Sequence, residues 1–224
     1  MSPTPSHPHR PVLDDELGRL RGCVLRMGEL VDRAICQAMA GLAQRDIDRC
    51  TAVIAEDARV NALHLDVREL SFAILLTQAP LACDLRETMS LLHIAAELER
   101  MGDHCVSIAK LAREVAHQPE LTTGVDLAAI GRSCSGQVRG VLCAMIASSA
   151  DQARRVAAGD DAIDRAYRRA FDQLVQTITT DRGSVYAGTQ LLLVAHHLER
   201  IADRVTNIAE DLVFLETGVI EELG

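Results

Sequence analysis

Residues 91–112 read LLHIAAELERMGDHCVSIAKLA, and a closely similar segment, LLLVAHHLERIADRVTNIAEDL, follows at 191–212. Aligned without a gap, the two segments share a Leu-Glu-Arg triplet and, three residues after it, an aspartate, Asp103 in one and Asp203 in the other. The offset of one hundred residues is far longer than the repeat unit of a solenoid. The sequence therefore indicates two copies of one small domain.

Both segments carry the buried stripe of a bundle helix. Their apolar residues follow one another at alternating intervals of three and four along the whole of 91–112 and 191–212. This spacing places them in one stripe on a helix, as in helices that pack in a bundle. No segment of the chain shows sustained strand alternation. We therefore expect an all-α fold of six long helices, arranged as two tandem three-helix bundles.

Prolines, glycines and capping residues set the expected helix boundaries. Asp84 with Glu87 fits a capping box that begins the third helix, and Pro119 and Gly124 mark the break between the copies. The expected helices cover about 13–44, 46–77, 84–117, 126–158, 160–180 and 184–217. The expected domains are a disordered tail at 1–12, a first bundle at 13–118 and a second bundle at 124–218.

Composition narrows the class of protein. The net charge of −9 argues against a nucleic-acid binder, which normally presents a basic face. No apolar run is long enough to span a membrane, so we expect no membrane insertion. The seven cysteines form no C-x-x-C pair, and we interpret them as small core residues in a reducing cytoplasm.

Two acidic side chains recur one turn apart, outside the apolar stripe. Glu99 and Asp103 share one helix face in the first copy, and Glu199 and Asp203 share the matching face in the second. Asn207 continues the second row. Because such an acidic row occurs in both copies, these rows are the main indication of function in the sequence.

The second helix of each copy adds another pair of oxygen-bearing side chains. These pairs are Asp57 with Asn61 and Asp160 with Asp164. The number of residues between each pair and the turn that follows it, near 80 or 182, is about the number between that turn and the acidic row of the next helix. At equal helical rise, each pair therefore lies beside, or next to, that acidic row. Oxygen ligands of this kind suit hard or borderline cations. We predict one metal site per copy, holding a divalent or iron-type ion (Fe, Zn, Mn or Mg).

A solvated acidic face is the alternative to a metal site. Arg100, Arg200 and Arg204 lie close enough in sequence to neutralise the acids. His104 and His196 lie beside the acidic rows, but neither has a counterpart in the other copy. Arg86, at the start of the third helix, is a candidate anion-binding residue together with the free N–H groups there.

Motifs for catalysis are scarce in this sequence. Di-iron bundle enzymes need two E-x-x-H motifs, and the chain has one, Glu114–His117. It has neither a phosphate-binding glycine loop nor a G-x-S-x-G elbow. We expect a protein that is not an enzyme. The alternative is a carboxylate-bridged metalloenzyme on a helical bundle, which would activate water or oxygen.

The acidic motifs, within ERMGDH and ERIADRVTNIAE, resemble those of the PhoU family, accessory proteins of the bacterial phosphate-specific transport system. The segment Asp84-Leu85-Arg86 after Pro80 supports the resemblance, which covers about 12–218. It implies a six-helix, two-bundle fold with metal ions or clusters at the two E-x-x-x-D motifs. Asn207 matches an asparagine of the family, whereas Ser107 stands at that place in the first copy, where we expect weaker metal binding.

The resemblance also implies a function. PhoU-like proteins are cytoplasmic negative regulators of phosphate uptake and of the phosphate-starvation response, and they are not enzymes. They are thought to couple the ATPase subunit of the phosphate ABC transporter to a membrane sensor histidine kinase, and they often form homodimers. We expect the same partners and the same location for this chain.

Overall fold

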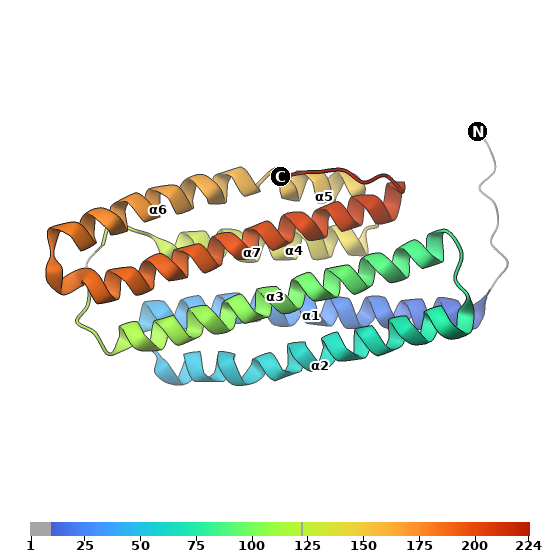
Figure 1. The fold of residues 1–224 in the computed structure, drawn as a ribbon, viewed down its shortest axis with the longest axis horizontal. Coiled ribbons are helices and arrows are strands. Elements are labelled where there is room, and N and C mark those ends of the chain that lie inside the picture. Colours follow the sequence, from blue (N-terminus) through green and yellow to red (C-terminus); the bar gives the residue numbers. More distant parts are fainter. Residues whose placement is uncertain (1–9, 122) are drawn as a thin grey trace.

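The computed structural model describes residues 10–121 and 123–224, which form long helices lying roughly along one axis (Figure 1). No β-strand occurs within these residues, so the predicted all-α fold is confirmed. In chain order the helices are α1 (Pro11–Gln44), α2 (Ile47–Gln78), α3 (Cys83–Ala116), α4 (Leu127–Ile146), α5 (Ala150–Ala157), α6 (Asp160–Thr180), the 3₁₀ helix η1 (Arg182–Ser184) and α7 (Val185–Thr217). None of these helices is long and apolar enough to cross a membrane.

The first two helices begin close to the expected positions. Helix α1 begins at Pro11, two residues early, because a proline at the first helical position leaves no N–H group to satisfy. Asp46 caps α2, and its carboxylate accepts a hydrogen bond of 2.9 Å from the N–H of Arg49. The expected tail at 1–12 falls mostly on residues 1–9, outside the described residues.

Helix α3 begins at Cys83, one residue before the expected Asp84, but its cap differs from the prediction. The residue before the helix is Ala82, with φ of 43°, and no side chain caps the first turn. The predicted capping box is therefore wrong. Glu87 instead accepts a bond of 2.5 Å from Arg21 of α1, which ties the beginning of α3 to its neighbour.

The single helix expected at 126–158 is broken into α4 and α5. Ser148 takes a left-handed φ of 47°, and the N–H of Ser149 donates back to the carbonyl of Ala144 at 3.0 Å. This closes α4 as in a Schellman-type end. The hydroxyl of Ser149 then accepts a bond of 3.3 Å from the N–H of Gln152 and begins α5. The break contains neither glycine nor proline, although Ser149-x-x-Gln152 is a capping-box pattern.

Helices α3 and α7, which carry the two similar segments, pack against each other at the centre of the molecule (Figure 1). Leu98 and Leu198, matching residues of the two apolar stripes, are both completely buried. Helices α1–α3 pack together, α4–α7 pack together, and the buried residues of both groups form one continuous core. The division into domains at 13–118 and 124–218 stays a prediction.

Four cysteines lie in the core, as expected for small apolar residues. They are Cys23, Cys50, Cys105 and Cys134. The side chains of Cys36 and Cys143 are exposed instead, so the core interpretation does not extend to every cysteine.

Candidate metal site

Three carboxylates of the second copy converge where α6 meets α7. One oxygen each of Asp160, Asp164 and Asp203 lies within 4.8 Å of the others. Asp160 and Asp164 are one turn apart at the start of α6, and Glu199 precedes Asp203 by one turn on α7. All four side chains are half-buried. The structure therefore brings together residues that the sequence placed at about one height.

Burial and mutual repulsion disfavour the charged form of these carboxylates. Burial, and then the charges of Asp164, Asp203 and Glu199, raise the pKa of Asp160 to about 6. Burial also raises the pKa of Glu199 and of Asp203. In addition, Asp160 Oδ1 and Glu199 Oε2 are buried without a hydrogen-bond partner among the described residues. A divalent cation would satisfy these oxygens and offset the repulsion, so the residues present fit a metal ion.

Cationic side chains also approach this cluster. Arg200 lies 2.6 Å from Asp203, and the mostly exposed Arg168 lies 3.9 Å from Asp164. His196 Nδ1 lies 3.5 Å from Glu199 Oε2, without hydrogen-bond geometry. An ion bound to Asp203 would therefore compete with Arg200.

The first copy is more open. Asn61 Nδ2 donates to Asp57 Oδ2 at 3.0 Å on α2. Burial and, after it, the charge of Asp103 on α3 raise the pKa of Asp57. A methyl group at Gly102 would lie 3.0 Å from Asp57 Oδ1, so this glycine gives the Asp57 carboxylate room against α3. Asn61 and Asp103 are exposed and Glu99 is half-buried. Among the described residues, the close grouping of three carboxylates occurs in the second copy alone.

Three other residues from the sequence analysis have their own contacts. Asn207 Nδ2 donates to Glu97 Oε2 at 3.0 Å, across the contact between α7 and α3. Ser107, its counterpart, donates to the carbonyl of Asp103 at 3.0 Å within α3. The guanidinium of Arg86 lies over the ring of Phe214, 6.0 Å from its centroid. Their predicted roles in metal or anion binding stay predictions.

Glu97, which the sequence analysis did not single out, is the centre of a buried polar network between α3 and α7. Its side chain is 1% exposed. It accepts hydrogen bonds from Arg100 at 2.7 Å, from Arg204 at 3.2 Å and from Asn207 at 3.0 Å. The repeat offered a way to find this network. Position 97 corresponds to 197 and position 104 to 204, so a contact between 97 and 204 has a counterpart between 197 and 104.

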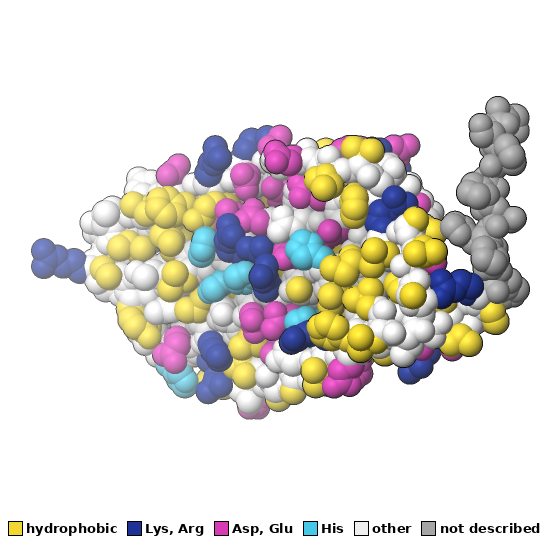
Figure 2. All heavy atoms as spheres, turned by 45° about the vertical axis from the view of Figure 1, so that its right-hand side comes forward, with side chains coloured by type: hydrophobic (Ala, Val, Ile, Leu, Met, Phe, Trp, Pro, Cys, Tyr) yellow, Lys and Arg dark blue, Asp and Glu magenta, His cyan; other side chains and the backbone are white. Residues whose placement is uncertain are grey.

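At the counterpart positions of the same contact between α3 and α7, two histidines face each other. His104 Nδ1 of α3 lies 3.1 Å from His197 Nδ1 of α7. Burial, together with the charges of His197, Arg204 and Arg200, lowers the pKa of His104 to about 4. Burial also lowers the pKa of His197. On the face drawn in Figure 2, histidine, basic and acidic side chains gather across the middle, with hydrophobic side chains on either side.

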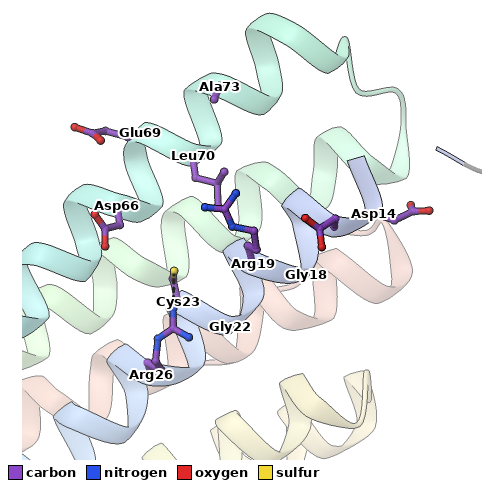
Figure 3. Close-up of a pocket in the computed structure, with 11 residues that line it drawn as sticks. Asp14, Gly18, Arg19, Gly22, Cys23, Arg26, Asp66, Glu69, Leu70 and Ala73 are labelled. Carbon is purple, nitrogen blue, oxygen red and sulfur yellow. Dashed lines mark hydrogen bonds between the residues drawn. The ribbon is translucent and has the colours of Figure 1, made fainter. Parts of the chain in front are cut away.

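A groove of about 920 Å³ lies elsewhere, between α1 and α2 (Figure 3). Gly18 and Gly22 leave room along α1, and Arg19 and Asp66 are among the charged side chains that line the groove. None of the predicted metal-binding residues lines it. It is therefore a separate feature from the carboxylate cluster.

The duplicated all-α architecture, with oxygen-bearing side chains between the last two helices of each half, defines a class of helical-bundle proteins with candidate metal sites. A family model described as "PhoU domain" matches residues 24–112 and 127–212 of the chain. The chain belongs to the PhoU family, and the resemblance stated from the motifs is confirmed.

Relatives match over nearly the whole length of the chain. The phosphate-specific transport system accessory protein PhoU homolog of Caulobacter vibrioides is 34% identical over 93% of this chain and 90% of its own. The homolog of Clostridium acetobutylicum, with the same description, is 29% identical over 93% and 96%. The crystal structure of PhoU from Pseudomonas aeruginosa superposes with a TM-score of 0.89 at 30% identity, covering 92% of this chain and 99% of that one.

Proposed function

We propose that this chain is a cytoplasmic regulator of phosphate homeostasis that restrains the phosphate-specific ABC transporter and phosphate-starvation signalling. The observation that carries the proposal is its match, over 93% of its length, to proteins described as accessory to the phosphate-specific transport system. The crystal structure of PhoU from Streptococcus pneumoniae, described as a phosphate transport system regulatory protein, is 32% identical and superposes with a TM-score of 0.84, covering 94% of this chain and 100% of that one. Regulation by protein contacts, rather than catalysis, is the role that these relatives support.

The partners in this proposal are the ATPase subunit of the transporter and a sensor histidine kinase, and the chain acts as a homodimer. The carboxylate cluster of Asp160, Asp164, Glu199 and Asp203 would hold a divalent or iron-type ion. Bound there, the ion supplies positive charge between α6 and α7. The more open site around Asp57, Asn61, Glu99 and Asp103 would hold its ion less tightly.

Deletion of the gene tests the regulatory role. In cells with ample phosphate, we expect phosphate uptake and phosphate-responsive transcription to stay at starvation levels. Restoring the wild-type chain should restore repression. Uptake and transcription that are unchanged by the deletion would contradict the proposal.

Metal analysis tests the carboxylate cluster separately. The wild-type chain, purified without a tag or chelator, is compared by mass spectrometry with a variant in which Asp160, Asp164 and Asp203 are changed to Asn. We expect this variant to contain less bound metal than the wild type, by about one ion per chain, and we expect no change in Asp172→Asn, which removes an exposed acid of the same helix. Equal metal content in all three proteins would show that the cluster is not the site.

A carboxylate-bridged metalloenzyme remains the second candidate, because three carboxylates converge within 4.8 Å. It predicts metal-dependent turnover of a phosphoester or a redox substrate that is lost in Glu199→Gln. Absence of such turnover in the metal-loaded chain would leave the regulatory role.

A further inference from the structure

Helices α3 and α7 meet through two corresponding pairs of positions, 97 with 204 and 197 with 104. In the first pair, Glu97 accepts a hydrogen bond of 3.2 Å from Arg204. In the second pair, the Nδ1 atoms of His197 and His104 face each other at 3.1 Å. One pair of positions therefore forms an ion pair across the interface, and the corresponding pair brings two imidazole nitrogens together.

We propose that His104 and His197 form a binding site for a divalent transition-metal ion such as Zn²⁺, which bridges the two halves of the molecule through the two Nδ1 atoms. Neutral imidazole is a common zinc ligand. Two nitrogens at the usual bond length of about 2.0–2.1 Å from a tetrahedral zinc ion lie about 3.3 Å apart. The observed 3.1 Å is close to this separation.

Among the described residues, no third side chain groups with the two histidines as a further metal ligand. Both side chains are half-buried, and they come from two helices that pack along each other. The ring of His196 lies 6.1 Å from that of His197, between centroids, so we assign the remaining metal positions to water. The two nearest arginines each have an acidic partner, because Arg204 binds Glu97 and Arg200 binds Asp203.

This site differs in chemistry from the carboxylate cluster. Imidazole nitrogens favour Zn²⁺, Ni²⁺ or Cu²⁺, whereas carboxylates suit Mg²⁺ and Mn²⁺. The competing explanation of the short contact is an Nδ1–H···Nδ1 hydrogen bond between two neutral rings. That explanation predicts no response to zinc, so a zinc titration separates the two.

The titration uses the full chain, stripped with a chelator, in a parent variant that carries Asp57→Asn, Asp103→Asn, Asp160→Asn, Asp164→Asn and Asp203→Asn, so that neither predicted carboxylate site can contribute. Calorimetry with Zn²⁺ should show one ion per chain. His104→Gln and His197→Gln should each weaken zinc binding by at least the roughly 10–100-fold that loss of an outer-shell partner costs. His117→Gln, which removes an exposed histidine outside the pair, should leave the affinity unchanged.

Thermal unfolding gives a second readout and a control for folding. Zinc should raise the melting temperature of the parent and of His117→Gln, but not that of His104→Gln or His197→Gln, whose far-UV circular dichroism should match the parent. Equal zinc affinity in all these variants, or no zinc binding by the parent, would overturn the proposal. Neither result would bear on the regulatory role, which the gene deletion tests by itself.

Discussion

Glu97→Ala should destabilise the chain by removing the centre of the network between α3 and α7. The Glu97 side chain is 1% exposed, and its partner Arg204 is 19% exposed, so the substitution leaves a largely buried guanidinium without its acid. Breaking a buried ion pair in this way costs about 3–5 kcal/mol. The bond to Arg100, which is 56% exposed, adds no more than about 1 kcal/mol. We therefore expect the free energy of unfolding to fall by about 3–5 kcal/mol.

Urea denaturation followed by circular dichroism measures this change, with Arg100→Ala as the matched control that should lose no more than about 1 kcal/mol. At about 2–4 °C per kcal/mol for a chain of this size, the melting temperature of Glu97→Ala should fall by about 6–20 °C. Replacing Glu97 and Arg204 together by leucine should recover much of the loss, because a buried pair and an apolar pair are often similar in stability. A loss below about 1 kcal/mol in Glu97→Ala, with an unchanged dependence on urea, would refute the importance of this network.

Four further substitutions test other parts of the structure. In metal-free protein, the Asp160 pKa of about 6, above its ordinary 3.8, means that the folded chain takes up a proton as pH falls from 6 towards 4 while the unfolded chain stays ionised. This contribution to stability grows as pH falls and is lost as pH rises through 6, so in urea titrations Asp160→Asn should remove it. Gly28→Ala should lower the free energy of unfolding by about 1–3 kcal/mol, because the added methyl overlaps Leu142. Gly136→Ala, with open space around the added methyl, should raise it by up to about 1 kcal/mol. Thermal unfolding measures both changes. Ser149→Ala should cost about 1 kcal/mol in the same assay by removing the cap of α5.

Helix positions were predictable where apolar spacing and a strong cap agreed. The stripes in 91–112 and 191–212 run without a break, and Asp46 caps α2 as expected. The cap of α3 and the break before α5 were missed because each depends on a non-glycine residue with positive φ, Ala82 and Ser148. Such a conformation is fixed by the surrounding packing and leaves little trace in local sequence.

The sequence predicted how far along the helices the candidate metal-binding residues lie, but not which way their side chains point. Counting residues from the helix turns placed Asp160 and Asp164 beside Asp203, and these three converge. Helix rotation cannot be counted in the same way, so the sequence did not show that Asn207 donates to Glu97 across the interface. Nor did it show that His104 faces His197, since that contact depends on how the two halves pack.

Helix α7 presents its acids and its interface residues to different neighbours. Glu199 and Asp203 approach the acids of α6, while His197 and Arg204 contact α3. The two sets are not fully independent, because the charge of Arg204 partly offsets the rise that burial causes in the pKa of Asp203. This separation explains why both copies keep E-x-x-x-D on the outer face, whereas the interface has Glu97 in one copy and His197 in the other. The acidic rows are therefore alike in the two halves, whereas the residues at the contact between α3 and α7 differ.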